Sequence, residues 1–487
     1  MSAPDRPSLT FTGLRALAKD TVQALNDRGI GLDDRVAIVL PNGSEMASTF
    51  VCIGCGATTA PLNPSYRQEE FEFYLEDLNA RALVVEQGST SPAVDAAKNK
   101  GVEVLEIAFS DTDPAGTFRF LSEPGGQAPA RGGLGGPEDI ALILHTSGTT
   151  SRPKIVPLTH TNLTASAFNI QQSLLLTNKD RCVNVMPLFH IHGLVAAILA
   201  SLNAGGSIYC TPGFNALKIF AWLDDAAPTW YTAVPTMHQA ILQRASRNRD
   251  VIEKHPLRFI RSCSSALPPQ VMVELEKCFD APVIEAYAMT EAAHQMTSNP
   301  LPPAARKPGT VGIAAGPDVA IMDNDGNLLD SGAVGEVVIR GVNVTPGYEN
   351  NPKANAENFT NGWFRTGDQG IMDEEGYVSI TGRLKEIINR GGEKISPREV
   401  DDVLMDHPAI QQVVTFAMPH AKLGEEVAAA AVLRDGESAD EAEIRKFAAT
   451  RLADFKVPRK ILFLEEIPKG ATGKLQRIGL AEKLGLA

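Results

Sequence analysis

The sequence predicts an α/β protein with a large N-terminal domain of mixed and parallel sheets, followed by a smaller α+β domain. Short apolar runs alternate with helical patterns over roughly the first 300 residues, and this alternation favours parallel sheets. Closely spaced turns in 316–348 predict a small antiparallel, barrel-like β unit that closes the large domain. The pattern changes again after Gly382, where roughly a hundred residues fit a compact α+β unit.

The individual elements follow from local patterns. Residues 35–63 predict a strand, a turn, a helix and a strand, with Asn42 to Ser44 suited to a turn and a helix cap. Residues 425–433 predict a strand and 440–456 a helix, whereas the Gly- and Pro-rich stretch 123–139 predicts a flexible linker. Further strands are predicted within 81–87, 102–107, 182–187, 206–212, 228–235, 257–265 and 282–290.

Bulk composition excludes several classes of protein. The chain has 487 residues and a net charge of −13, which argues against nucleic-acid binding because that function needs a basic surface. The six cysteines include one C-x-x-C without a second pair or nearby histidines, so we expect structural thiols in a reducing compartment. No secretory signal is visible, and the most apolar window, 193–202, is too short to span a bilayer. We therefore expect a cytoplasmic protein; the sequence does not decide between monomer and dimer.

The stretch HTSGTTSRPK (145–154) follows the apolar run DIALIL and offers a site for an oxyanion or a polyphosphate. Gly148 lets the backbone approach a ligand, and Arg152 and Lys154 supply positive charge. A polar surface turn is the alternative. An ordinary P-loop is excluded, because the second glycine of that motif is missing. The hydroxyl donors in the stretch are Thr146, Ser147, Thr149, Thr150 and Ser151.

Four further stretches carry groups suited to binding a nucleotide. In EAYAMTEAAH (285–294), Thr290 and Glu291 could contact phosphate and Mg²⁺, unless Glu291 only caps a helix. In GWFRTGDQG (362–370), Asp368 could accept hydrogen bonds from a ribose, unless it is a turn residue. The last two stretches are GRLKEIINRGGEKISPREVD (382–401), with Arg383 and Gly391-Gly392, and IPKGATGKLQR (467–477), with Lys474, which could equally be a surface lysine.

Together and in this order, these stretches resemble the adenylate-forming enzymes, which include acyl-CoA synthetases, adenylation domains of peptide synthetases and luciferases. The resemblance runs from about Gly31 to Arg477. It implies an N-terminal AMP-binding domain (1–384) and a small mobile C-terminal domain (385–487) that turns about a hinge at Lys385. It also implies a two-step reaction in which a carboxylate attacks the α-phosphate of ATP and CoA then displaces AMP to form a thioester.

The resemblance also implies roles for particular residues. The loop from Thr146 to Lys154 would hold the β- and γ-phosphates, Lys474 would bridge the acid and the α-phosphate, and Glu291 would hold Mg²⁺. Lys385 would be the hinge, and Gly391-Gly392 would line the CoA tunnel. The loop departs from the family at Ile155, where glycine is usual. The remaining nucleotide contacts would come from Ser264, Ser265, Ala266, Glu285, Ala286, Tyr287, Thr290, Asp368 and Arg383.

The acid site is similar to that of the oxalate:CoA ligase group within this family, since the loop carries Ser-Arg-Pro-Lys and a histidine follows the Thr-Glu pair. A second carboxylate in a small pocket needs polar or positive partners. The candidates are His190, His192, Ser264 and His294. Alternatively, His190 only controls access to the site. Open alternatives are a small or medium-chain fatty acid, another dicarboxylate such as malonate, a stand-alone enzyme that loads a carrier protein, and an inactive binding homologue.

Overall fold

The computed structural model describes the chain except for residues 122–124, 126, 147–152 and 470–474. Its first sheet has the strand order β5-β4-β3-β1-β2-β6-β7, with parallel middle strands and antiparallel edges. Parallel strands need crossover connections, and the helical segments predicted between them supply these. The strands are β1 (Arg35–Val39), β2 (Thr58–Pro61), β3 (Ala82–Glu86), β4 (Glu103–Ala108), β5 (Arg119–Phe120), β6 (Ile140–Thr146) and β7 (Lys154–Thr159).

Helices cover both faces of this sheet, which explains why its strands are apolar on both sides. Helices α1 (Phe11–Asn26) and α2 (Ser44–Gly54) pack on the face that carries Val36 and Ile38. Helices α3 (Gln68–Asp77) and α4 (Pro92–Lys100) pack on the opposite face, against Ala37 and Val39. The prediction of strand, turn, helix and strand in residues 35–63 is therefore confirmed.

The cap of helix α2 lies within Asn42 to Ser44, as predicted, but no side chain of this stretch caps the helix. The residue before helix α2 is Gly43, with φ +155° and no side-chain hydrogen bond to the helix. Asn42 instead accepts a hydrogen bond from the backbone N–H of Leu188 at 2.8 Å and donates one to the carbonyl of Thr211 at 3.2 Å. The side chain thus joins the first sheet to the loops of the second, a long-range contact that the local pattern could not indicate.

The second sheet has the order β14-β13-β12-β11-β10-β8-β9 and confirms the strands predicted between 182 and 290. One of its faces packs on α7 (Ile219–Ala226), α8 (Pro235–Ala245) and α10 (Pro269–Phe279), and η2 (Ser246–Asn248) and α9 (Arg249–Lys254) follow α8. Its strands are β8 (Arg181–Asn184), β9 (Ser207–Cys210), β10 (Trp230–Ala233), β11 (Phe259–Ser262), β12 (Val283–Met289), β13 (His294–Ser298) and β14 (Ile313–Ala314).

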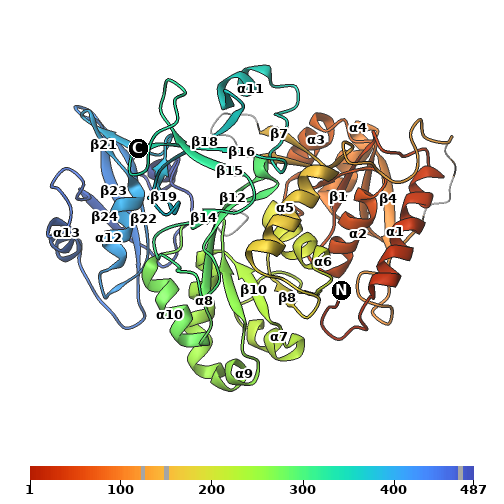
Figure 1. Cartoon of the computed structure of the whole chain (residues 1–487), viewed down its shortest axis with the longest axis horizontal. Helices are drawn as coiled ribbons and strands as arrows, with labels where there is room; N and C mark the ends of the chain where they lie inside the picture. Colours follow the sequence, from red (N-terminus) through yellow and green to blue (C-terminus); the bar gives the residue numbers. More distant parts are fainter. Residues whose placement is uncertain (122–124, 126, 147–152, 470–474) are drawn as a thin grey trace.

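A helical layer lies between the two sheets and carries the largest core (Figure 1). It consists of α5 (His160–Ser173), the π-helix η1 (His192–Leu199) and α6 (Ala200–Asn203). Leu163 and Ile170 of α5 and the apolar residues of η1 share one cluster with Leu142 of the first sheet and Phe259 of the second. Side chains at the start of η1 are therefore enclosed by both sheets.

A five-stranded antiparallel sheet of order β15-β16-β18-β17, with β19 paired to β18, follows the second sheet. It contains the antiparallel unit predicted in 316–348. Its strands are β15 (Asp318–Met322), β16 (Val334–Arg340), β17 (Phe359–Thr360), β18 (Trp363–Met372) and β19 (Val378–Arg383), with α11 (Pro352–Asn358) before β17. The 3₁₀ turn η3 (Thr290–Ala292) connects β12 to β13.

The C-terminal unit is a mixed sheet with helices, as predicted. Its strand order is β21-β20-β23-β22, with β24 parallel to β23. Helix α13 ends at Ala449 instead of the predicted 456, because the chain turns at Thr450 and the N–H of Leu452 bonds back to Ala448. The elements are β20 (Ile388–Arg390), β21 (Glu393–Ile395), α12 (Pro397–Met405), β22 (Ile410–His420), β23 (Gly424–Leu433), α13 (Glu441–Ala449), β24 (Lys460–Phe463) and α14 (Leu480–Lys483).

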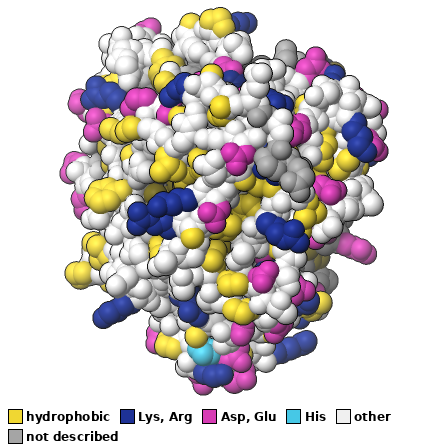
Figure 2. Space-filling view, turned by 90° about the vertical axis from the view of Figure 1, so that its right-hand side faces the viewer, with side chains coloured by type: hydrophobic (Ala, Val, Ile, Leu, Met, Phe, Trp, Pro, Cys, Tyr) yellow, Lys and Arg dark blue, Asp and Glu magenta, His cyan; other side chains and the backbone are white. Residues whose placement is uncertain are grey.

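The distribution of charged side chains on the surface agrees with the acidic composition. On the face shown in Figure 2, Lys and Arg side chains are dispersed among Asp and Glu and form no basic tract. None of the helices in the described ranges is long and apolar enough to cross a membrane. All six cysteines are free thiols, four of them buried, as predicted for structural thiols.

Candidate active site

The predicted phosphate loop joins two antiparallel strands whose ends lie side by side. Thr146, the last residue of β6, pairs with Lys154, the first residue of β7. Ser147, Gly148, Thr149 and Thr150 lie outside the described residues. The Lys154 ammonium is 4.2 Å from the centroid of the Tyr348 ring, a cation–π contact. Burial lowers the pKa of Lys154, while the nearby Glu291 opposes this shift.

Glu291 is a buried carboxylate on η3, with 7% of its surface exposed. Its Oε1 accepts a hydrogen bond from the Tyr348 hydroxyl at 2.8 Å. Burial raises the pKa of Glu291, and the hydrogen bond from Tyr348 and the positive charge of Lys154 oppose this rise. Lys154, Tyr348 and Glu291 therefore form one connected group beside the strand ends that hold the loop, with Thr290 next to Glu291 in the chain.

A second group joins β12 to the β18–β19 hairpin. Asp368 on β18 and Arg383 on β19 are cross-strand partners, and Arg383 Nε donates to Asp368 Oδ1 at 3.0 Å. The other carboxylate oxygen of Asp368 accepts a hydrogen bond from the Tyr287 hydroxyl. Three residues predicted to contact adenosine, separated by almost a hundred positions in the sequence, are thus in direct contact.

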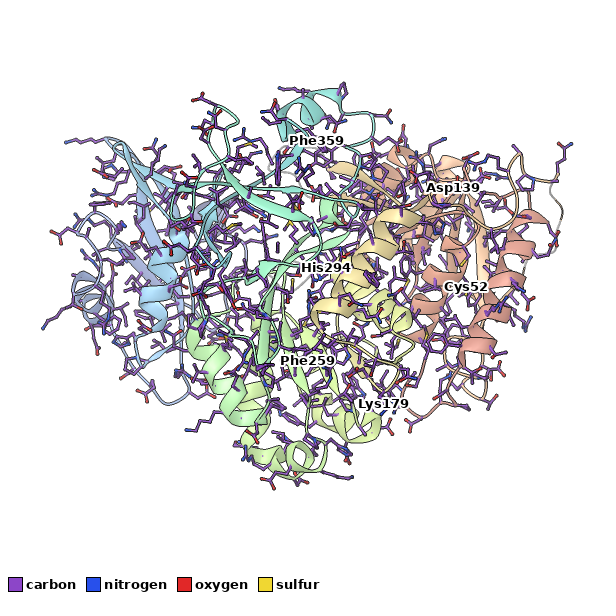
Figure 3. All side chains as sticks on the ribbon, viewed as in Figure 1. Cys52, Asp139, Lys179, Phe259, His294 and Phe359 are labelled. Atoms are coloured by element: carbon purple, nitrogen blue, oxygen red, sulfur yellow. The ribbon has the colours of Figure 1, made fainter. Side chains whose placement is uncertain are left out.

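A third group places two histidine rings together between the sheets. His192, the first residue of η1, is fully buried; its Nε2 is 2.6 Å from Thr232 Oγ1, and its Nδ1 is 3.0 Å from Ser264 Oγ. The His294 ring, also fully buried, stacks on His192 with centroids 5.1 Å apart and planes at 27°. Figure 3 labels His294 near the centre of the molecule, where β13 approaches the helical layer.

Backbone geometry supports this third group. His294 has φ +108° and Ser264 has φ +73°, conformations that cost a non-glycine residue energy and that cluster at functional sites. His190 is half-buried, and its Nδ1 accepts a hydrogen bond from the backbone N–H of His192 at 3.3 Å. Of the four residues predicted to bind the acid, His192 thus contacts both Ser264 and His294. The fourth, His190, contacts the backbone N–H of His192.

A cavity of about 270 Å³ lies between the second sheet and the C-terminal unit. Glu285 on β12 is buried next to it, and burial raises the pKa of Glu285 to about 7. Glu285 Oε1 accepts the backbone N–H of Leu267 at 2.9 Å, which fixes the end of the 264–266 segment, and the neighbouring Ala286 is also buried. The cavity lining includes Ser264, Ser265, Ala266, Arg383, Asp401 and Arg477.

The segment predicted to act as hinge and CoA tunnel lies on the surface. Lys385 is exposed just after β19. Gly391 and Gly392 form the exposed turn between β20 and β21 with φ +59° and +101°, left-handed values that glycine adopts without strain. Lys474, the last predicted nucleotide contact, lies outside the described residues.

Comparison with known protein families identifies the class of enzyme. Residues 3–349 match the model of the AMP-binding enzymes, and residues 399–474 match that of the AMP-binding enzyme C-terminal domain. The chain belongs to the AMP-binding enzyme family. The predicted adenylate-forming acid:CoA ligase class is thereby confirmed, with ATP and CoA as substrates alongside a small carboxylic acid.

Individual relatives of this AMP-binding enzyme cover almost its whole length. It is 44% identical to the oxalate–CoA ligase of Arabidopsis thaliana, over 97% of this chain and 95% of that protein. It is 45% identical to the oxalate–CoA ligase of Saccharomyces cerevisiae, over 92% of this chain and 86% of that one. The crystal structure of ATP-bound MatB from Rhodopseudomonas palustris matches with a TM-score of 0.86 and 29% identity, over 97% and 93% of the two chains.

Sequence reasoning missed several residues that complete the site of this AMP-binding enzyme. Thr232 lies in a predicted strand, and its signal was a hydroxyl within an otherwise apolar run. Tyr348 ends the segment that was interpreted only as a β unit. Asp401 and Arg477, which form an ion pair at 2.6 Å beside the cavity, each end a stretch that was singled out for other residues, and their pairing could not be predicted because they are far apart in the sequence.

Proposed function

We propose that this enzyme is an oxalate:CoA ligase. One carboxylate oxygen of oxalate attacks the α-phosphorus of ATP, and pyrophosphate leaves. The CoA thiol then attacks the acyl carbon of the adenylate, AMP leaves, and oxalyl-CoA is formed. The observation that carries the choice of acid is the stacked, fully buried pair His192 and His294. The names of two relatives at 44–45% identity support it.

The physical argument concerns the second carboxylate of the substrate. A buried carboxylate needs hydrogen-bond donors or positive charge, because its desolvation is otherwise too costly. His192 already has Thr232 and Ser264 as partners that fix its ring, and His294 packs against it face to face. Such a polar, enclosed site suits a short diacid, whereas an alkyl chain would need an apolar channel. His190 is assigned to the entrance of this site.

The same proposal assigns the nucleotide contacts. Thr146, Lys154 and the loop between them hold the β- and γ-phosphates, and Lys474 bridges the acid and the α-phosphate. Thr290 contacts the α-phosphate. Asp368 and Arg383 hold the ribose, and Tyr287, in contact with Asp368, stacks on adenine. Ser264, Ser265, Ala266, Glu285 and Ala286 complete the adenine side. The work is positioning and charge stabilisation, since no protein nucleophile is required.

Mg²⁺ fits the residues beside this loop. Glu291 Oε1 accepts a hydrogen bond from the Tyr348 hydroxyl, and the Glu291 carboxylate lies close to Lys154 at the start of β7. The described part of the chain holds no group of three or more His, Cys, Asp or Glu side chains placed around one metal position. One carboxylate together with substrate phosphates and water is the usual arrangement for this ion, which when bound neutralises charge on the phosphates.

The second half-reaction is assigned to a rearrangement of the C-terminal unit. We place the domain boundary at Lys385, between the 1–384 and 385–487 regions, and Gly391-Gly392 on the path of the CoA pantetheine. The exposed left-handed turn at these glycines supports a close approach of ligand and backbone. The free cysteines support the cytoplasm as the compartment.

The test is CoA- and ATP-dependent AMP release with a panel of acids: oxalate, malonate, acetate, octanoate and benzoate. Activity that is strong and nearly exclusive to oxalate would support the proposal. Activity with malonate or a monocarboxylate would keep the two-step reaction but overturn the assignment of the acid. Product mass analysis with CoA or carrier proteins as acceptor separates a CoA ligase from an enzyme that loads a carrier.

A further inference from the structure

Arg261 is a fully buried arginine on β11 that none of the proposed roles uses. Among the described side chains that are almost fully buried, it is one of the largest. A guanidinium stays charged in proteins, although burial lowers its pKa here, so β11 carries a positive charge into the interior. Buried charges are normally paired, because desolvation of an isolated ion is costly.

The described residues provide Arg261 with very few partners. Nη2 donates to Gln295 Oε1 at 3.2 Å, and the Cys263 thiol, a weak acceptor, lies beside the guanidinium. Nε and Nη1 make no hydrogen bond to any described oxygen or nitrogen, and no described carboxylate forms an ion pair with Arg261. The nearest buried carboxylate along the sheet, Glu285, is in register with Ser262, so it faces the other side of the sheet.

The position of Arg261 links it to both histidines of the acid site. Arg261 is the register partner of Thr232 on β10, and Thr232 contacts His192 Nε2 at 2.6 Å. Gln295, the acceptor for Arg261, directly follows His294 in β13. The guanidinium is thus connected to His192 through the neighbouring Thr232 and to His294 through Gln295, on the face of the sheet toward the helical layer. A buried positive charge that no described carboxylate offsets favours an anion bound in the proposed acid site.

We propose that Arg261 is the fixed positive charge that selects doubly charged acids, because it attracts the second carboxylate from behind the histidine pair. This inference rests on the proposed function, since it explains how the same site takes a dianion. At an effective dielectric constant of about 20, opposite charges within about 10 Å of each other attract enough for about a tenfold change in an equilibrium constant. Arg261 thus determines specificity and takes no part in bond making.

The experiment compares oxalate with oxamate, its monoamide, which has nearly the same size but lacks the second negative charge. ATP–pyrophosphate exchange gives kcat/KM for both acids with the native enzyme, Arg261→Met, Arg261→Lys and Arg340→Met. Arg340 is an exposed arginine paired with Asp318 on the β15–β16 hairpin and serves as the matched control. Unfolding midpoints are measured without acid.

We expect the native enzyme and Arg340→Met to prefer oxalate by about tenfold or more. Arg261→Met should lose most of this preference through KM, and Arg261→Lys should retain part of it. Without acid, Arg261→Met should unfold at the same temperature or higher, because an uncompensated buried charge has been removed. An unchanged preference in Arg261→Met would overturn the inference.

The outcomes keep the two proposals apart. A native enzyme that uses oxamate as well as oxalate would overturn the role of Arg261 even if neither variant folds. A native enzyme that is inert toward oxalate and oxamate would overturn the proposed function. In that case malonate and its monoamide provide the same charge comparison for Arg261.

Discussion

Replacement of Tyr348 by phenylalanine tests whether Glu291 binds Mg²⁺. The hydroxyl donates to Glu291 Oε1 at 2.8 Å, and the ring lies 4.2 Å from the Lys154 ammonium. Phenylalanine keeps the ring and its contact with Lys154 but removes the hydroxyl. The change therefore isolates one hydrogen bond to a buried carboxylate.

The size of the effect follows from that hydrogen bond. A hydrogen bond to a charged group contributes about 1.5–3 kcal/mol, which corresponds to about 10- to 150-fold in an equilibrium constant. Burial already raises the pKa of Glu291, and the hydrogen bond from Tyr348 is the largest influence that opposes this rise. In Tyr348→Phe the pKa of Glu291 rises further, so a proton competes more strongly with Mg²⁺ for this carboxylate than in the native enzyme.

The assay is ATP–pyrophosphate exchange titrated with Mg²⁺ at about pH 6.5 and about pH 8.5. We expect the Mg²⁺ midpoint of Tyr348→Phe to rise by about tenfold or more at the lower pH. The difference should be smaller at the higher pH, because competition by protons weakens as the pH rises. Tyr377→Phe is the control, because Tyr377 donates to the carbonyl of Ala305 and its ring lies 4.1 Å from Lys307 Nζ. An unchanged midpoint, or an equal shift at both pH values, would refute the reasoning.

Three further predictions concern other parts of the molecule. Lys474→Ala should abolish adenylate formation but largely spare thioester formation from a supplied acyl-adenylate; equal loss of both half-reactions would contradict the role given to Lys474. Burial raises the pKa of Glu285 to about 7 from an ordinary value of 4.5, so this group makes the folded state less stable as pH rises through that window. The native enzyme should lose about 3 kcal/mol of its free energy of unfolding between pH values below and above this window, and Glu285→Gln should not show this loss. Urea unfolding at pH values on both sides of the window measures the difference. Ile155 is buried in the core of the first sheet, and Ile155→Ala should lower the free energy of unfolding by about 2–4 kcal/mol, measured in urea; a loss well below this range would show that the site collapses around the smaller side chain.

The sequence was most informative where a local pattern has one structural solution. Residues 35–63 fold as predicted because a run of five apolar residues, a turn and a second, largely apolar segment leave few alternatives. Helix α13 ends earlier than predicted because its last turn is closed by Thr450, and apolar spacing beyond that point does not show that the chain has turned. Asn42 lies in the stretch that was interpreted as a turn and a helix cap, but the hydrogen-bond partners of its side chain are more than a hundred residues away.

The candidate site residues divide in the same way. Thr290, Glu291 and Asp368 stand in recognisable stretches, so a role in binding could be proposed for them from the sequence. Tyr348 and Thr232 act through contacts with residues distant in sequence, and only the fold brings them to Glu291 and His192. A polar or charged residue within an apolar strand was nevertheless a signal available in the sequence, for Thr232 and equally for Arg261.

Because η1 is a π-helix, the number of residues in it determines the direction in which His192 points in the proposed acid site. A π-turn contains one more residue than an α-turn, and α-helix follows directly at Ala200. Removal of a single residue from 193–199 would allow the segment to relax into an α-helix. Each helical residue corresponds to roughly a 100° rotation, so His192 would turn away from Thr232 and Ser264. A one-residue deletion would thus give a more regular helix without the contacts of His192, so the length of this segment, and not only its composition, matters for the proposed acid site.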